Sequence, residues 1–508
     1  MFVDLQLGNL HEPISGRSWD KKTIYDKFWH RVNSLKSQGL SASDRILIHY
    51  GNNLEFFVDL LAIWNLGASA IPIDSRLTAF EVENLARLTQ PRFSLWGELI
   101  DESVGVALNG IGVKIIQADS THNLSKSSSP TPLGSQFSLD HEAMILFTSG
   151  TTGQPKGVVH THRTLRARWM SLRENLGLKR FRRTLCLLPT HFGHGLICNC
   201  LFPWLSGQDL FILPAFRPEI IMQLGSIIDA YKITFMSSVP PVWRLALKLT
   251  KSPKERTLEQ VHCGSAPLSG NLWKEIMQWT GTNNVLNAYG ITETGSWVAG
   301  TTIEDFQPDD GLIGKPWGAV IKVLKSGTTD ITPVEAEECK PSEQGYIWIN
   351  TPALMQGYFG RDDLTNKVVA QGWFLTGDIG LIDDRGLLYL RGRERDEINK
   401  GGMKIFPSDI DAVVERFAGV VDVCAFGFTE ELYGEDVGVA IVMQKSDNHA
   451  LQQLYKWTRQ HLAEHQMPRR WFLLSEIPRT SRGKVSRVQV AETCSHLSPI
   501  GKDRLKAI

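Results

Sequence analysis

The sequence predicts an α/β protein with a large N-terminal domain, residues 1–394, and a small C-terminal domain, residues 395–508. Strand-like and helix-like segments alternate through the first half, a pattern typical of parallel sheets flanked by helices. The chain of 508 residues is also longer than a domain with a single hydrophobic core usually is, so we expect two or three domains.

The alternation is clearest near the N-terminus. A β-rich run at 45–50 is followed by a helix-like segment at 53–67, which has one apolar face and is stopped by Gly67. Next we expect a strand, a helix, a strand and, after a polar loop, a further strand, at 69–74, 78–90, 92–96 and 143–147.

A change of composition near residue 395 sets the domain boundary. A charged, glycine-containing stretch at 391–405 follows the last strand-like run of the large domain. Beyond it, strand and helix patterns resume at 421–428, 437–443 and 451–465. These elements predict a second, smaller α+β unit.

Bulk composition narrows the class of protein. Basic and acidic residues balance at 54 each, which argues against a general nucleic-acid or acidic-membrane partner. Seven scattered cysteines favour reduced, buried thiols. The N-terminus lacks the basic start and apolar core of a signal peptide, and the most apolar run, 196–205, is too short to span a bilayer. We therefore expect a soluble, cytoplasmic protein.

The strongest chemical signal is the run from Thr148 to Gly157. Its glycines allow a tight turn that presents N–H groups, while its hydroxyls and one lysine can bind a polyphosphate. A strand-like run precedes it and a helix-like one is expected after it, which disfavours a plain linker; the spacing is not that of a Walker A loop. The candidate ATP-binding residues are Thr148, Ser149, Gly150, Thr151, Thr152, Gly153 and Lys156.

This run resembles the phosphate loop of the adenylate-forming superfamily, which includes acyl- and aryl-CoA ligases, peptide-synthetase adenylation domains and luciferase-type enzymes. Further segments resemble the motifs of that superfamily in the same order, over roughly residues 20–490. The resemblance implies a large domain with parallel-containing sheets flanked by helices, plus a mobile C-terminal domain.

Two of these segments lie upstream of residue 300. Residues 287–295 resemble a YGxTE motif, which implies that Tyr289 packs near adenine and that Thr292 contacts the α-phosphate. An acid beside a phosphate needs an intervening cation, so Glu293 is the candidate Mg²⁺ ligand. Residues 264–269 resemble a segment that lines the adenine pocket, contributed here by Ser265, Ala266 and Pro267, with Ser265 in place of the commoner glycine.

The remaining motifs lie toward the C-terminus. Asp378 matches a TGD motif, and its carboxylate can accept hydrogen bonds from both ribose hydroxyls. The match implies that Arg393 contacts nucleotide, that Arg395 is the hinge (Asp396 being the neighbouring alternative) and that Gly402 lies in a loop on the thiol side. Lys484 matches a catalytic lysine, and its charge would offset repulsion between carboxylate and α-phosphate.

The acid pocket is expected around Thr190–Gly195. Phe192 fits an aromatic gate, and His191 and His194 either bond a polar substituent or are structural. No aspartate stands here to pair with an α-amine, which favours an uncharged or hydroxylated acyl or aryl acid.

The predicted function is ATP- and Mg²⁺-dependent activation of a small carboxylic acid as an acyl-adenylate, followed by thioester formation. The chain ends 24 residues after Lys484, so the thiol is expected in trans, as coenzyme A or the phosphopantetheine of a separate carrier protein. Two alternatives belong to other classes. One is a non-catalytic nucleotide-binding protein; the other is a zinc peptidase with His461 and His465 on one helical face, in an H-x-x-E-H spacing.

Overall fold

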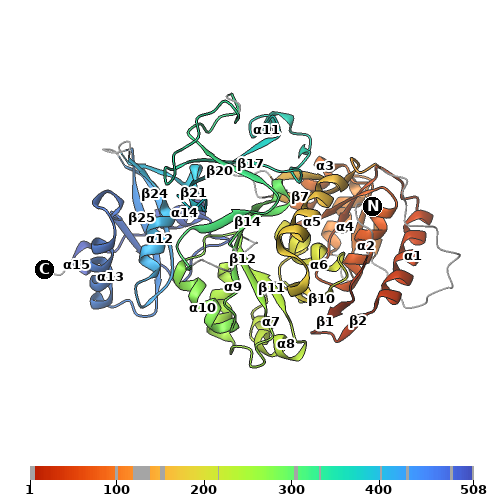
Figure 1. Ribbon diagram of the computed structural model, residues 1–508, viewed down its shortest axis with the longest axis horizontal. Helices are drawn as coiled ribbons and strands as arrows, with labels where there is room; N and C mark the ends of the chain where they lie inside the picture. The colour runs from red at the N-terminus through yellow and green to blue at the C-terminus, as the bar shows by residue number, and fades with distance from the viewer. Residues whose placement is uncertain are drawn as a thin grey trace.

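The computed structural model describes residues 6–97, 101–117, 138–148, 155–215, 217–301, 307–330, 333–400, 403–430, 434–480 and 484–505. It confirms the predicted α/β class. Figure 1 shows the N-terminal helices α1 and α2 at one end of the molecule and the C-terminal sheet with α12 and α13 at the other. In the described part of the chain, none of the helices combines the length and apolar composition needed to cross a membrane.

The N-terminal half of the large domain is built on a mostly parallel sheet. Its strand order is β18-β8-β7-β4-β3-β5-β6, and β7, β8 and β18 pair antiparallel at one edge. The four residues of β4 are all buried, as expected of a strand covered on both faces. The strands are β3 (Arg45–Ile48), β4 (Ser69–Pro72), β5 (Phe93–Trp96), β6 (Lys114–Gln117), β7 (Glu142–Thr148), β8 (Lys156–Thr161) and β18 (Gly357–Tyr358).

The expected helices follow their strands. Helix α2 (Leu54–Asn65) begins after Asn53, whose side chain accepts a hydrogen bond from the Phe56 amide. Gly67, with φ 75°, follows the end of this helix. The helices of this half are α1 (Lys21–Ser37), α2 (Leu54–Asn65), α3 (Ala79–Thr89), α4 (Glu102–Gly110) and α5 (His162–Leu176).

A second, larger sheet runs β16-β17-β20-β21-β15-β14-β13-β12-β11-β9-β10-β1-β2, with β19 beside β20. From β1 through β10, β9, β11 and β12 to β13 it is parallel, and from β13 to β16 it is antiparallel. The strands are β1 (Leu10–Glu12), β2 (Arg17–Trp19), β9 (Arg183–Cys186), β10 (Asp209–Ile212), β11 (Phe235–Ser238), β12 (Gln260–Gly264), β13 (Val285–Ile291), β14 (Ser296–Gly300), β15 (Leu312–Pro316), β16 (Val320–Leu324), β17 (Gly345–Asn350), β19 (Val369–Ala370), β20 (Trp373–Ile382) and β21 (Leu388–Arg393).

Short helices join the strands of this sheet. They are α6 (Phe202–Trp204), α7 (Pro218–Ile221), α8 (Leu224–Ala230), α9 (Pro240–Leu249), α10 (Gly270–Thr280) and α11 (Asp362–Thr365). A π-helical segment, His194–Leu201, precedes α6 and is buried throughout. Such wide turns often occur at functional sites.

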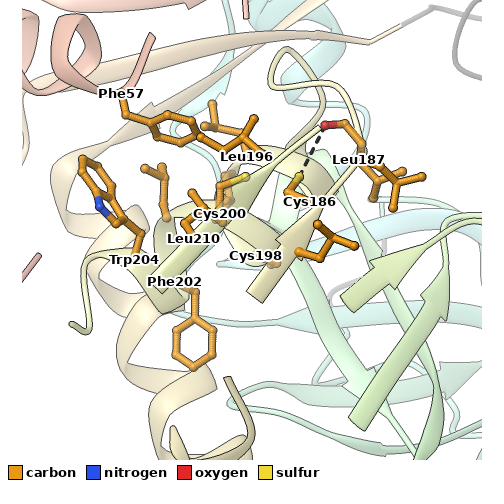
Figure 2. Close-up of a cluster of buried hydrophobic side chains, with 14 of the residues drawn as sticks. Phe57, Cys186, Leu187, Leu196, Cys198, Cys200, Phe202, Trp204 and Leu210 are labelled. Carbon is orange, nitrogen blue, oxygen red and sulfur yellow. Dashed lines mark hydrogen bonds between the residues drawn. The ribbon is translucent and has the colours of Figure 1, made fainter. Parts of the chain in front are cut away.

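This π-helical segment is anchored in the core. In Figure 2, Leu196, Cys198 and Cys200 lie among aromatic and aliphatic side chains that include Phe57 and Trp204. Six of the seven cysteines are buried and all seven are free thiols, as the scattered spacing predicts.

The C-terminal sheet contains strands that follow Arg393. Its order is β23-β22-β25-β24, with β26 parallel to β25. The elements are β22 (Ile398–Lys400), β23 (Met403–Ile405), α12 (Pro407–Glu415), β24 (Val420–Glu430), β25 (Gly434–Met443), α13 (Asn448–His461), β26 (Arg470–Leu473), α14 (Arg487–Ser495) and α15 (Lys502–Leu505). Two hydrophobic clusters of this region draw all their members from residues 398–505.

Candidate functional site

The predicted phosphate loop closes a β-hairpin. Thr148, the last residue of β7, pairs with Lys156, the first residue of β8. The expectation of a helix directly after the loop is therefore wrong, because the Val158–Val159 pair is β-branched and continues the sheet, and α5 begins only at His162. Ser149, Gly150, Thr151, Thr152 and Gly153 lie outside the described residues.

A tyrosine links this hairpin to the predicted metal ligand. The Tyr358 hydroxyl donates to Glu293 Oε1 at 2.8 Å, and Lys156 Nζ lies 5.1 Å from the centre of the Tyr358 ring. Burial, followed by the nearby Glu293 carboxylate, raises the pKa of Tyr358 well above its usual value, so the phenol keeps its proton and remains a donor. Tyr358 thus contacts both Lys156 and Glu293, which come from separate elements.

Thr292 and Glu293 occupy a 3₁₀ turn directly after β13, Thr292–Thr294. The turn is held by its backbone, because His160 Nε2 lies 2.9 Å from the Thr292 carbonyl oxygen and the Met355 amide donates to the Glu293 carbonyl at 2.7 Å. Burial lowers the pKa of His160 to about 4, so the ring is neutral and its Nε2–H is the donor to the carbonyl.

Asp378 is fixed through both carboxylate oxygens. The Tyr289 hydroxyl donates to Oδ2 at 2.6 Å, and Arg393 Nε lies 2.6 Å from Oδ1. The three residues come from β13, β20 and β21, and Asp378 faces Arg393 in the sheet register. Asp378 as a whole residue is 4% exposed, and its carboxylate retains unused lone pairs for a further donor such as a hydroxyl.

The Ser265–Pro267 segment follows β12. Gly264 ends that strand where a Cβ would stand 2.2 Å from the Ala288 carbonyl oxygen, so only glycine fits. Ser265 has φ 63°, the left-handed region that favours glycine. Ala266 is half-buried and Pro267 is exposed.

The three predicted acid-pocket residues differ in their contacts and burial. His191 Nε2 lies 3.5 Å from Asp74 Oδ2, at the end of the neighbouring sheet. Phe192 and His194 are buried, with ring centres 6.0 Å apart. His194 is bonded through both ring nitrogens to serine hydroxyls, at 2.9 Å to Ser265 and 2.6 Å to Ser237.

Lys484, from the small domain, lies beside one of the predicted acid-pocket residues. Its Nζ lies 5.7 Å from the centre of the Phe192 ring. Burial, and then the Lys484 charge, lowers the pKa of His194 to about 3. The lysine backbone is fixed by Thr480, whose amide donates to the Lys484 carbonyl at 2.8 Å. In this orientation the predicted catalytic lysine and the predicted aromatic gate are neighbours.

Polar contacts hold the small domain in this orientation. Arg244 on α9 lies 2.5 Å from Glu415 on α12, and Asp310 is paired with Arg416. Arg395, the predicted hinge, lies in a 3₁₀ turn, Glu394–Asp396, with its side chain 53% exposed. Gly402 lies outside the described residues.

The two histidines with the zinc-peptidase spacing do not lie on one helix, contrary to the expectation. Helix α13 ends at His461, and His465 lies in a separate 3₁₀ turn, Glu464–Gln466, so the two histidines do not share a helical face. The His461 ring stacks on Trp457 and its Nδ1 lies 2.8 Å from the Trp457 carbonyl oxygen, an interaction that holds the helix end. Across the described ranges, no group of three or more acidic, histidine or cysteine side chains is placed to hold a metal.

Sequence reasoning missed Tyr358, His160, Ser237 and Asp74. Each comes from a strand or strand end far from the motif that it contacts, as with Tyr358 and Glu293, 65 positions apart. No local pattern marks such a residue, since each contact forms only when distant strands are brought together.

Comparison with known proteins finds relatives that cover most of the chain. The chain is 27% identical over 486 residues to an oxalate–CoA ligase of Arabidopsis thaliana, covering 92% of each chain. It is 28% identical over 476 residues to a 2-succinylbenzoate–CoA ligase of Bacillus licheniformis, covering 92% of this chain and 94% of the relative. The structure of an o-succinylbenzoate CoA synthetase from Bacillus subtilis with its acyl-adenylate intermediate shares the fold, with a TM-score of 0.81, 24% identity and coverage of 96% and 95%.

Two family descriptions match the sequence. The AMP-binding enzyme family matches residues 20–359, and the AMP-binding enzyme C-terminal domain matches residues 409–484. The first match alone covers more than half of the 508 residues, and together they confirm the predicted resemblance. The chain belongs to the AMP-binding enzyme family.

Proposed function

We propose that this protein is an AMP-forming acid–thiol ligase. In the first half-reaction a carboxylate oxygen attacks the α-phosphorus of ATP, giving an acyl-adenylate and releasing pyrophosphate. In the second, a thiol attacks the acyl carbon, forms a thioester and releases AMP. The observation that carries the proposal is the position of Lys484, which a second domain places against Phe192 at the predicted acid pocket.

Lys484 is proposed to act in the first half-reaction. Carboxylate and polyphosphate are both anions, so their approach is repulsive unless a cation lies between them. An ammonium beside Phe192 is in position to offset that repulsion and to stabilise the charge that develops as the carboxylate attacks.

The nucleotide is proposed to lie along the motif residues of the large domain. Asp378 would accept from the ribose hydroxyls, Tyr289 and Ser265–Pro267 would line the adenine pocket, and Arg393 would hold the carboxylate of Asp378 in place. Thr292 and the hairpin loop that begins at Thr148 would contact the phosphates.

Glu293 is proposed as the Mg²⁺ ligand. Its Oε1 accepts one hydrogen bond from Tyr358, and a carboxylate has further lone pairs with which to bind a hydrated ion. Magnesium commonly uses one or two protein carboxylates together with substrate phosphates, so this donor set fits it. When bound, the ion would neutralise phosphate charge.

We propose coenzyme A as the thiol acceptor. The relatives named above are CoA ligases, which supports this choice. The phosphopantetheine of a separate carrier protein remains the alternative. We also propose a cytoplasmic location, since all seven cysteines are free thiols, as expected in a reducing compartment.

The two half-reactions are proposed to need two orientations of residues 395–508. Lys484 and the loop at Gly402 belong to the same small domain and cannot both face one site, so the domain would rotate about Arg395. The domain boundary at 394/395 and the thiol-side role of Gly402 are part of this proposal.

The test is a panel of carboxylic acids assayed with Mg-ATP. We expect pyrophosphate and AMP to be released in amounts that depend on the acid, and thioester to form when coenzyme A or a phosphopantetheinylated carrier is added. Release of ADP and phosphate in place of AMP and pyrophosphate would contradict the proposal.

A further inference from the structure

Lys484 belongs to a small hairpin, the lysine hairpin, whose described arms are residues 478–480 and 484–486. Arg479 and Val485 form an antiparallel bridge between the two arms. Helix α14 begins at Arg487, three residues after the lysine. The place of the Lys484 backbone in the small domain therefore depends on the contacts that hold the two arms.

An arginine holds each arm to the body of the small domain. Arg479 Nη2 lies 2.5 Å from Asp422 Oδ2, and Arg487 Nη2 lies 2.7 Å from Asp411 Oδ2. Asp422 belongs to β24 and Asp411 to α12. Helices α12 and α14 both contact β24, and all three lie in the C-terminal part of the molecule (Figure 1). The lysine hairpin is thus fixed to this part of the fold by two ion pairs.

The Arg487 guanidinium has a different acceptor near each of its three nitrogens. Nη1 donates to the Ala425 carbonyl at 2.6 Å, Nη2 donates to Asp411, and Nε lies 4.0 Å from Asp396 Oδ2. The Arg487 side chain is 18% exposed. A planar guanidinium can address several acceptors in fixed directions, whereas a lysine ammonium is a single point charge. The contacts of this side chain therefore require arginine.

Asp396 ends the 3₁₀ turn that contains the predicted hinge, Arg395. Its Oδ1 lies 3.6 Å from Arg395 Nε, and its Oδ2 is the oxygen near Arg487. At the other end of the turn, Arg393 is paired with Asp378 of the large domain. One end of the hinge turn is thus bound to the large domain and the other end to the residue that begins α14.

These contacts make Lys484 and the end of the hinge turn parts of one body. The backbone between Lys484 and Arg487 is itself held, because the Ser486 amide donates to the Pro478 carbonyl at 3.3 Å. An error of about 1 Å in the place of a catalytic group can cost about a hundredfold in rate. If Arg487 released Asp396, Lys484 would keep its charge but lose its fixed place relative to the hinge.

We infer that Arg487 is a positioning residue for the first half-reaction. It ties the lysine hairpin to the hinge turn, so that Lys484 is held beside Phe192 in one defined orientation of the small domain. Arg487 acts through Lys484 and does not itself contact the substrates. This inference rests on the proposed function, because it requires that Lys484 act in adenylation.

The first variant is Arg487→Lys, which keeps the positive charge beside Asp411. Removal of that charge would leave the largely buried Asp411 carboxylate unpaired, which strongly destabilises a fold. We expect kcat for adenylation to fall by about tenfold to a hundredfold, with KM for ATP and for the acid little changed, since the lost interaction belongs to the transition state. Thioester formation from supplied acyl-adenylate should slow less than adenylation does.

The decisive comparison uses the Lys484→Ala background. If Arg487 acts through the lysine, Arg487→Lys should slow adenylation by Lys484→Ala less than about twofold, because the group that it positions is absent. A variant that only weakens the domain would slow both backgrounds equally. Arg469→Lys is the matched control: Arg469 pairs with Glu430, at the end of β24, and with Asp436, and its variant should adenylate at the parent rate.

Asp396→Asn tests the link to the hinge turn. The substitution removes a partly exposed charge 4.0 Å from Arg487, so adenylation should slow by about twofold to fivefold while the melting temperature changes little. The loss should be smaller in the Arg487→Lys background, since both substitutions weaken one contact, and it should be absent in Lys484→Ala. If Arg487→Lys does not fold, Asp396→Asn in the parent and Lys484→Ala backgrounds gives the same comparison.

The outcomes separate this inference from the proposed function. A parent rate of adenylation in Arg487→Lys, equal slowing in the parent and Lys484→Ala backgrounds, or an Asp396→Asn loss that adds in full to that of Arg487→Lys would overturn the inference and leave the ligase proposal standing. If Lys484→Ala adenylates at the parent rate, the proposed role of the lysine fails, and the inference fails with it.

Discussion

The two halves of the site are held together in different ways. On the large-domain side, Tyr289, Asp378 and Arg393 come from strands of one sheet and contact one another at 2.6 Å. On the small-domain side, Lys484 reaches Phe192 across a boundary held by polar contacts such as Arg244–Glu415. The first half is part of the fold, whereas the second can separate without breaking a sheet.

The hydrophobic cores show the same difference. The clusters of the small domain consist of residues 398–505, and the large-domain clusters consist of residues before 394. Among the described residues, no hydrophobic cluster joins the two parts. Polar interfaces of this kind permit relative motion, because separation exposes little apolar surface. The proposed pair of half-reactions, with nucleotide held by the large domain and Lys484 carried by a domain that rotates, predicts a boundary of this kind.

The largest expected effect comes from removing the movable charge. Lys484→Ala should slow adenylation by about a hundredfold to a thousandfold, the scale of losing one preorganised electrostatic contact. Rapid-quench measurement of acyl-adenylate formation checks this. Thioester formation from supplied acyl-adenylate should survive, and equal loss in both half-reactions would refute this division of labour.

On the fixed side, Glu293→Gln should cost about tenfold to a hundredfold in adenylation and raise the Mg²⁺ concentration needed for half-maximal rate. The reason is loss of the anionic ligand; the amide oxygen can still accept from Tyr358, so the melting temperature should change little. Lys156→Ala is the comparison, with a smaller loss because N–H groups and hydroxyls of the loop share the phosphates. Unchanged rate and Mg²⁺ requirement for Glu293→Gln would rule out its role.

The hinge prediction tests whether the boundary is correctly placed. Proline fixes φ near −65° and removes an N–H, so Arg395→Pro should restrict one orientation and slow one half-reaction by about tenfold or more, sparing the other. Separate assays of the two steps, with a thermal melt to show folding, check it. Asp396→Pro controls for an error of one residue; normal rates for both variants would place the hinge elsewhere.

The smallest effect is expected at the interface ion pair. Arg244→Glu places a like charge opposite Glu415. It should change the ratio of the rates of the two half-reactions by a few-fold, because a partly exposed ion pair contributes about 1 kcal/mol or less. The double variant Arg244→Glu/Glu415→Arg restores opposite charges and should return the balance to that of the parent. If the double variant behaves as the single one does, the pair has no part in orientation.

The sequence was most informative where chemistry and local structure coincide. The alternation at 45–96 predicts strands and helices that the structure has, and Gly67 stops α2 as expected. The motif segments led to Tyr289, Asp378 and Arg393, which the fold brings into contact. Each of these signals is contained within a few residues, so one sequence is enough to find it.

Two of the three failures share a physical cause. The sequence predicts a helix directly after the phosphate loop, whereas the structure has the strand β8. This strand forms because it pairs with β7, and the local sequence does not reveal that pairing. The spacing of His461 and His465 predicts that both lie on one helical face. It does not reveal that α13 ends at His461. Ser237 is one β11 residue among many until the fold places it on His194. The first and the last of these depend on partners that lie elsewhere in the chain, whereas the end of α13 is local, with the His461 ring stacked on Trp457.

The central claim is that adenylation belongs to the orientation seen here and thioester formation to another. Cysteines at Arg244 and Glu415, in a Cys339→Ser background, can be bridged by a bismaleimide with a cleavable disulfide spacer, since the other six cysteines are buried. We predict that the bridged protein forms acyl-adenylate at the parent rate, makes no thioester, and regains thioester formation on reduction. Thioester formation at the parent rate while bridged would contradict the account.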